Sequence, residues 1–370
     1  MDFLVEKSDL LEQLHFVRGA VEKKATIPIL SHFLLEADGF ELRIAATDLE
    51  ITARTTCQAK VRTKGAAVVS SQRFFEIIRS AEGGEIRCCS LGNHSVQVAY
   101  GRSSFKLVGL AKSDYPKFPT IPEPIARVNA RILADCVTRT AFAISEQESR
   151  YILNAALLKL KPDSVTMVTT DGHRLALTER KAQISDLKAE FSVLIPKRAL
   201  ALLPRFIEGR EGDARVEISK DDSHLHFSLS PRILTSRLLA GQFPNYESVL
   251  PKENGKVVQL NSKEFANVIR RVSLLADDRV LGVRFALDKD HLEVSSSSPE
   301  YGEAKEFIES QYDQEGVQIG FNAQYLLDFL CTVSAAAIRM QLKDAESAAE
   351  FRPCGDDGEQ YRYVLMPLRF

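Results

Sequence analysis

The chain repeats one pattern three times over its 370 residues, and this repetition constrains its fold more than any other feature. Each copy begins with a short apolar strand and an amphipathic helix, in which bulky apolar side chains recur at helical spacing. In the first copy a Ser/Asp cap is expected to start the helix, and its apolar stripe consists of Leu10, Leu11, Leu14, Val17 and Val21. In the third copy the stripe consists of Phe265, Val268, Ile269 and Val272. Leu10, Leu133 and Phe265 are equivalent in these helices and lie 123 and 132 residues apart. A period of this length indicates a repeated domain, because the units of solenoid proteins span roughly 20–50 residues.

A second helix recurs inside each copy, after an apolar strand and a polar hinge. Its equivalent residues Arg73, Arg198 and Gln324 lie 125 and 126 residues apart. This marker is independent of the first, yet it returns nearly the same period.

An apolar strand closes each copy, and its equivalent residues Leu110, Leu239 and Met366 lie 129 and 127 residues apart. Three unrelated α+β segments are the alternative interpretation. Those segments would have to share one period by chance in three kinds of marker, so we favour three similar domains.

Short runs of alternating apolar and polar residues lie between the helices, as in ELRIAAT (41–47) and ARVEISK (214–220). Such alternation predicts antiparallel sheets with one buried face, and Asp/Gly/Asn-rich turns separate the runs. The predicted fold is therefore α+β, with two helices covering one side of the sheets in each copy. Pro-containing polar stretches predict boundaries that give domains over 1–122, 126–249 and 252–370.

The net charge of −2 argues against a protein that simply coats nucleic acid, although it leaves a basic inner surface open. Six cysteines show neither a CxxC pair nor metal-ligand spacing, so no metal or cofactor is predicted. The first residues do not resemble a signal peptide, and no apolar run approaches 18 residues. We expect a cytoplasmic protein.

Basic residues gather in the predicted helices, whereas acidic residues cluster mainly in strands and loops. The basic helical positions are His15, Arg18, Lys23, Lys24, Arg73, Arg79, Arg131, Arg139, Lys197, Arg198, Arg205, Lys263, Arg270 and Arg271. Such a surface can neutralise phosphates without reading bases. Charge alone does not separate this hypothesis from ordinary solvation of helix faces. The repeat favours a phosphate-binding surface, because equivalent helices can line one common face.

Five segments closely resemble the bacterial β sliding clamp, the processivity subunit of DNA polymerase III. They are TDLEITA (47–53), RYILNA (150–155), TTDGHRLALTE (169–179), QFPNYESVLP (242–251) and YVLMPLRF (363–370). The resemblance implies three similar DNA-clamp domains per protomer and a head-to-tail dimeric ring around duplex DNA. It also implies no catalysis. The implied partners are the polymerase III catalytic subunit, the clamp loader, and other polymerases and repair proteins, all bound through short peptide motifs.

The resemblance also implies roles for particular residues. Duplex DNA contacts map onto Lys24, Arg73, Gln147, Arg150, Tyr151, Lys197 and Arg198. The partner-peptide pocket maps onto Leu153, Thr170, Gly172, His173, Arg174, Leu175, Pro244, Val249, Val364, Met366, Pro367, Leu368 and Arg369. The dimer interface maps onto Phe105, Leu107, Leu274 and Leu275. Two departures stand out: Ser248 replaces a residue that is often basic, and Ile152 replaces a tyrosine of some members.

Two other functions compete with the clamp. One is a monomeric, sequence-independent duplex-binding protein without ring closure, and the other is an enzyme using Asp171 and His173. No nucleophile motif accompanies those two residues, and no further His or carboxylate stands at metal-ligand spacing. We instead expect Gly172 to form a tight turn that Asp171 caps.

Overall fold

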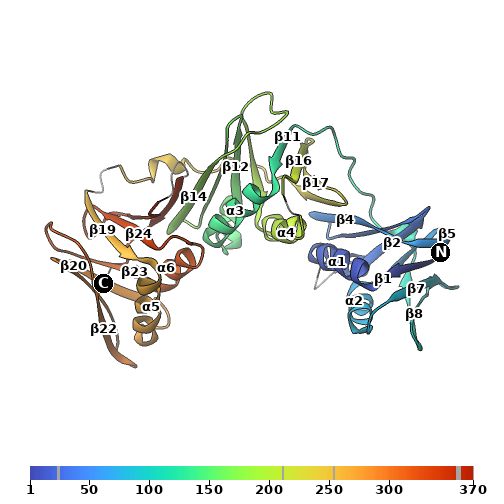
Figure 1. The fold of residues 1–370 in the computed structure, drawn as a ribbon, viewed down its shortest axis with the longest axis horizontal. Coiled ribbons are helices and arrows are strands. Elements are labelled where there is room, and N and C mark those ends of the chain that lie inside the picture. The colour runs from blue at the N-terminus through green and yellow to red at the C-terminus, as the bar shows by residue number, and fades with distance from the viewer. Residues whose placement is uncertain (23–25, 211, 253–254, 356–359, 370) are drawn as a thin grey trace. The chain divides into compact units, whose positions relative to one another are not determined.

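The computed structural model describes residues 1–22, 26–210, 212–252, 255–355 and 360–369, which form two compact units. The first unit comprises Met1–Arg131, Ile184–Lys188 and Arg198–Leu238. The second comprises Ile132–Gln183, Ala189–Lys197 and Leu239–Phe370. Each unit combines antiparallel sheets with helices, which confirms the α+β prediction (Figure 1).

The first unit contains a nine-stranded and a five-stranded sheet. The larger sheet has the order β10 (Gly109–Leu110), β6 (Gly65–Ser70), β2 (His32–Asp38), β3 (Glu41–Thr47), β4 (Ile51–Gln58), β18 (Arg232–Arg237), β17 (His224–Leu229), β16 (Arg215–Lys220) and β11 (Ala126–Asn129). The smaller has β5 (Lys60–Thr63), β1 (Asp2–Glu6), β7 (Glu85–Ser90), β8 (Val96–Tyr100) and β9 (Ser103–Leu107). Pairing of β4 with β18 places Ala53 opposite Leu234, so one sheet runs from the first repeat into the second.

Helices α1 (Lys7–Val17) and α2 (Ser71–Ser80) pack side by side in this unit (Figure 1). Most of α4 (Lys197–Ile207) also belongs to it. In the predicted apolar stripe of α1, Leu10, Leu14 and Val17 are buried, which follows from packing against β3 and β4. Leu11 is only half-buried, and Val21 lies beyond the end of the helix.

The sequence predicted a Ser/Asp cap for α1, and this prediction is wrong. Strand β1 runs directly into the helix after Glu6, so Ser8 and Asp9 lie inside the first turn and no side chain caps it. The backbone N–H of Lys7 donates instead to the carbonyl of Gly84 at 3.0 Å. A neighbouring loop thus satisfies one of the donors that a cap would otherwise bind.

The second unit contains an eight-stranded and a four-stranded sheet. The larger has the order β15 (Phe191–Pro196), β12 (Ala155–Lys161), β13 (Ser164–Thr170), β14 (Arg174–Lys181), β26 (Gln360–Leu365), β25 (Ala349–Pro353), β24 (Ala337–Leu342) and β19 (Lys256–Asn261). The smaller has β22 (Gly302–Glu309), β21 (His291–Ser298), β20 (Gly282–Asp288) and β23 (Val317–Asn322). Pairing of β14 with β26 continues a sheet from the second repeat into the third.

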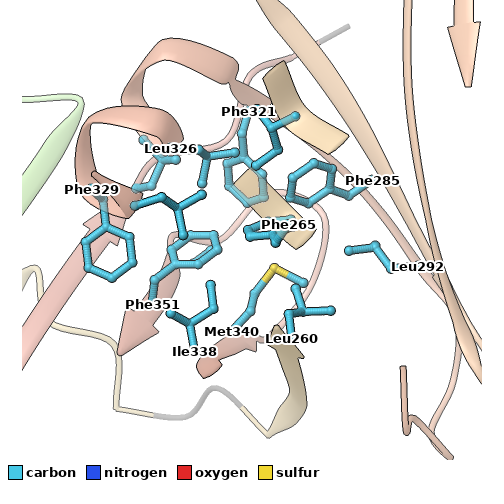
Figure 2. Packing of buried hydrophobic residues seen from close by; sticks show 14 of the residues in the cluster. Leu260, Phe265, Phe285, Leu292, Phe321, Leu326, Phe329, Ile338, Met340 and Phe351 are labelled. Atoms are coloured by element: carbon cyan, nitrogen blue, oxygen red, sulfur yellow. The ribbon is translucent and has the colours of Figure 1, made fainter. Parts of the chain in front are cut away.

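Most of α3 (Ala130–Thr140), together with α5 (Ser262–Val272) and α6 (Ala323–Leu330), belongs to the second unit. Every residue of the predicted α5 stripe is buried: Phe265, Val268, Ile269 and Val272. Phe265 packs edge-on against Phe285 in a core that also contains Met340, as Figure 2 shows. Among the described residues, no helix is long and apolar enough to span a membrane.

Candidate functional site

An apolar cluster lies where β14 and β26 pair, and we call it the β14–β26 cluster. Its buried members are Ala155, Leu157, Val168, Leu175, Leu177, Leu194 and Val364. Two predicted pocket residues meet in it, since Leu175 lies opposite Val364 in the sheet. Val249 and Met366, which the sequence also assigned to the pocket, expose 47% and 44% of their surface. Exposed apolar side chains near a buried cluster can anchor apolar side chains of a partner.

The segment before residue 251 packs on the β14–β26 cluster through side chains that the sequence analysis did not single out. Phe243, Tyr246 and Leu250 are half-buried against it. Their spacing of three and four residues is helical, and the short 3₁₀ helix η6 (Tyr246–Ser248) lies among them. This spacing was the signal that could have found them. Pro244, the residue predicted instead, is exposed.

The predicted tight turn at Gly172 is confirmed. Gly172 has a φ of +91°, a left-handed conformation that glycine adopts without a steric penalty. The Asp171 carboxylate accepts the backbone N–H groups of His173 at 2.9 Å and Arg174 at 3.0 Å. The hydroxyl of Thr170 donates to the carbonyl of Arg174 at 2.7 Å. These hydrogen bonds hold the backbone of the turn in place, and the turn exposes Gly172 and His173 to solvent.

Arg174 lies beneath this turn, and its side chain is only 9% exposed. Its Nε donates to Asp171 at 3.0 Å, and one terminal nitrogen donates to Asp328 of α6 at 2.6 Å. The other terminal nitrogen donates to the carbonyl of Phe142 at 2.6 Å. Burial lowers the pKa of Arg174, but its charged and hydrogen-bonding partners outweigh burial and leave the pKa raised. Arg174 therefore supports the turn from below and does not present its charge at the surface.

The end of the chain forms the other side of this site. The backbone N–H of Met366 donates to the carbonyl of His173 at 2.9 Å, which joins the tail to the turn. The N–H of Leu368 donates to the carbonyl of Gly320 at 2.8 Å. Pro367 is half-buried and Arg369 is exposed. These contacts place the predicted tail residues beside the predicted turn residues.

Replacing Gly172 with alanine is expected to weaken binding of a partner peptide and to lower the free energy of unfolding by roughly 1–2 kcal/mol. A Cβ at this position would lie 2.7 Å from a terminal nitrogen of Arg150, and the left-handed backbone would be strained. Peptide titration and urea denaturation measure the two effects.

Gly209→Ala is the matched control, because Gly209 also has a positive φ of 77° but no atom within 4 Å of the added Cβ. It should lose a similar amount of stability and keep peptide affinity. Equal loss of peptide affinity in both variants would contradict a local role for Gly172.

Three predicted DNA-contacting residues lie together at the 3₁₀ segment η5 (Glu148–Asn154) of the second unit. Gln147, Arg150 and Tyr151 are all exposed, Tyr151 by 56%. Arg150 donates to the carbonyl of Asp171 at 3.1 Å, so this exposed segment touches the turn described above. Leu153, predicted for the pocket, is half-buried at the end of the same segment.

The other predicted DNA-contacting residues lie on helices, at α2 and at the start of α4. The side chain of Arg73 is 70% exposed and pairs with Glu76 at 3.3 Å. Lys197 pairs with Glu146 at 3.0 Å, and this ammonium group lowers the pKa of Glu146. Arg198 pairs with the buried carboxylate of Asp48 and remains 54% exposed. The Arg73 and Lys197 pairs are exposed, and ion pairs of this kind are weak and leave the cations free to exchange partners. Lys24 lies outside the described residues.

The four predicted interface residues lie at or near edge strands. Phe105 and Leu107 are half-buried on β9, the last strand of the five-stranded sheet. Leu274 in the 3₁₀ helix η7 (Ser273–Leu275) is 75% exposed, and Leu275 is half-buried. η7 contacts β22, which is the edge strand of the four-stranded sheet. Unpaired edge strands with nearby apolar side chains can pair with another chain.

Comparison with known proteins covers the whole chain. Residues 1–119, 127–245 and 247–369 match the N-terminal, central and C-terminal domains of the DNA polymerase III beta subunit. The beta sliding clamp of Pseudomonas putida is 32% identical over 374 residues, with both chains fully covered. Two solved sliding clamps are similar in structure over the full length of this chain. The clamp of Pseudomonas aeruginosa bound to griselimycin has a TM-score of 0.93 and 30% sequence identity, and it is fully covered. The clamp of C. crescentus has a TM-score of 0.92 and 31% sequence identity, and 99% of it is covered.

The repeated α+β domains, the exposed basic helices and the apolar cluster with its turn define a non-catalytic DNA clamp. The Asp171 carboxylate fits this class, since it holds the backbone of the turn and the Arg174 guanidinium. Within the described ranges, no group of three or more His, Cys, Asp or Glu residues could hold a metal ion. The chain belongs to the family of DNA polymerase III beta subunits, the bacterial β sliding clamps.

Proposed function

We propose that two protomers close head-to-tail into a ring around duplex DNA, and that the β14–β26 cluster tethers the replicative polymerase and other replication or repair proteins through short peptides. The observation that carries this proposal is the exposure of the predicted DNA-contacting cations. Arg73, Arg150 and Arg198 are all exposed at helices or helical turns, although the chain has a net charge of −2. Contacts of this kind bind phosphates weakly and without sequence preference, so the ring can slide. A protein with this role acts in the cytoplasm.

Retention on circular DNA tests this proposal, because enclosure differs from affinity. Once loaded on a nicked circle by a clamp loader, the protein should stay bound at moderate salt and dissociate when the circle is cut. Equal retention on circular and linear DNA would favour the alternative, a monomeric duplex-binding protein.

Replacing Leu274 with aspartate is expected to convert the dimer into a monomer and to abolish retention on circles. Ring closure would bury this side chain, so the substitution would leave a carboxylate buried without a partner. Light scattering measures the mass, which should fall to the 41.2 kDa of one chain.

Phe40→Asp serves as the control for this substitution. Phe40 is 84% exposed in the turn between β2 and β3, away from the predicted interface residues in the sequence. This variant should remain dimeric. A parent protein that is already monomeric at micromolar concentration would contradict the proposed ring.

A further inference from the structure

The junction between the first two repeats contains a second copy of the turn that Asp171 caps. It spans residues 47–52, between β3 and β4, and lies within the first unit. The Asp48 carboxylate accepts the backbone N–H groups of Glu50 at 2.9 Å and Ile51 at 2.6 Å. Asp171 accepts the two equivalent N–H groups in the second unit. The two turns therefore share one pattern of backbone hydrogen bonds.

The strand that meets this turn repeats the second unit as well. The backbone N–H of Arg237 donates to the carbonyl of Glu50 at 2.8 Å, just as Met366 donates to the turn of the second unit. Leu49 occupies the position of Gly172, has a φ of +76° and is 51% exposed. This conformation is strained for a leucine, so the hydrogen bonds of the turn must impose it. The first junction thus has the backbone of the proposed peptide site.

The side chains at the first junction differ in character from those of the β14–β26 cluster. Strand β4 pairs with β18 as β14 pairs with β26, and the register of these pairs assigns the equivalent positions. Polar or cationic residues replace apolar ones at four of them: Thr52 for Leu175, Arg54 for Leu177, Thr235 for Val364 and Arg237 for Met366. We call these four residues of the first unit, together with Leu49, the β4–β18 site. Its ligand must differ from an apolar peptide.

An aromatic segment packs over the β4–β18 site. Tyr115 and Phe118 are three residues apart, as Phe243 and Tyr246 are in the second unit, and both pairs pack on an apolar cluster. The guanidinium carbon of Arg54 lies 5.6 Å from the centroid of the Phe118 ring. A contact of this kind is weak, so a carboxylate of a ligand can take the place of the ring.

The guanidinium of Arg54 lacks acceptors for its N–H groups. Its Nε and one terminal nitrogen are buried, and no described residue accepts a hydrogen bond from either. Burial also lowers the pKa of Arg54. A buried charged donor without an acceptor is costly, which favours a ligand that supplies one. The side chain as a whole is half-buried, so a ligand can reach it from solvent.

Arg237 supplies a second cation at the same site. It pairs with Glu50 at 3.2 Å, and the two side chains are 61% and 60% exposed. Such an exposed pair is weak, so a carboxylate of a ligand can replace Glu50. The β4–β18 site therefore offers two guanidinium groups to an anionic ligand, beside the exposed side chain of Leu49.

We infer that the β4–β18 site binds an acidic peptide segment of a partner protein, with one carboxylate on Arg54 and another on Arg237. The inference rests on the proposed function, because the proposed peptide site is its template, and it adds a second site with a different preference. A carboxylate accepts two parallel hydrogen bonds from a guanidinium, which suits the two unpartnered nitrogens of Arg54. Leu49 and the half-buried Ile233, which lies opposite Arg54, can contact apolar side chains between the carboxylates.

Titration of the full-length protein with a short fluorescein-labelled peptide of alternating glutamate and leucine tests this inference. Arg54→Leu, which copies the residue of the second unit, should weaken binding roughly ten-fold, and Arg237→Met roughly three-fold. The same peptide with glutamine in place of glutamate should bind the parent roughly ten-fold more weakly. Arg237 is exposed, so its replacement keeps the test valid if Arg54→Leu does not fold. Arg62→Leu is the matched control, since Arg62 is exposed on β5 of the five-stranded sheet, and it should bind the peptide as the parent does.

Three results would overturn the inference. The first is parental affinity in both variants, or an equal loss in the Arg62 control. The second is displacement of the peptide by acetate beyond the effect of chloride at matched ionic strength, which would indicate a site for a small carboxylate only. The third is binding that Gly172→Ala abolishes and Arg54→Leu preserves, which would place the peptide at the β14–β26 cluster.

Retention on circular DNA separates these results from a failure of the proposed function. A parent that is retained on circles, with variants that bind the acidic peptide normally, refutes only the β4–β18 site. A parent that is not retained, with variants that lose the peptide, refutes only the ring.

Discussion

Replacement of Arg174 with alanine is expected to abolish peptide binding and to lower the free energy of unfolding of the second unit by about 3–5 kcal/mol. The guanidinium satisfies Asp171, Asp328 and the carbonyl of Phe142, and the arginine side chain is 9% exposed. Its removal leaves two carboxylates with an uncompensated charge and a carbonyl without its donor. The turn then loses the side chain that supports it. The carbonyl of His173 in this turn accepts the backbone N–H of Met366, so the position of Met366 depends on the turn as well.

Urea denaturation measures the stability of this variant, and peptide titration is done where it is still folded. Arg369→Ala removes the same charge from an exposed position at the end of the chain and should leave stability within about 0.5 kcal/mol. An Arg174→Ala protein with parental stability and parental peptide affinity would show that these ion pairs do not support the turn.

Replacement of Phe329 with alanine is expected to lower the free energy of unfolding of the second unit by about 3–5 kcal/mol. Phe329 is fully buried on α6, and its ring stacks on Tyr363 with centroids 4.8 Å apart and planes inclined by 5°. Phe329 also contacts Phe351, which lies beside it in Figure 2, and Tyr361. The substitution therefore leaves a large cavity among aromatic rings. Burial raises the pKa of both tyrosines, which shows how far this region is from water.

Phe329→Leu should lose less stability, because it keeps more of the side-chain volume. Phe40→Ala removes an equally large ring that is 84% exposed and should change stability by less than about 0.5 kcal/mol. Similar losses from Phe329→Ala and Phe40→Ala would contradict the burial that the structure shows.

Local periodicity explains why the helices and most strands could be predicted from the sequence. In α5, the spacing of Phe265, Val268, Ile269 and Val272 requires one buried face, and all four are buried. Alternation likewise identified the segments that form β3 and β16. Alternation shows which face of a strand is buried, but it does not show which strand lies beside it. The pairings of β4 with β18 and of β14 with β26 were therefore not predictable.

The candidate site was predictable to a similar extent. The turn at Gly172 follows from residue type alone, because Asp and Gly adopt such turns readily. Burial of Arg174 does not, since arginine is usually exposed and its partner Asp328 is 154 residues away in the chain. The resemblance named Arg174 as part of the pocket, whereas its contacts assign it the task of holding the turn in place.

The sheets that run through two repeats limit how this chain can be divided for experiments. Residues Ile51–Arg54 of β4 hydrogen-bond to β18, so a fragment containing only the first repeat would carry a bare strand edge there. A fragment without the third repeat would expose β14 along Arg174–Glu179. Such edges are templates for intermolecular pairing. Isolated repeats should therefore aggregate or exchange strands, and fragments divided at the repeat boundaries would misrepresent how the intact chain behaves.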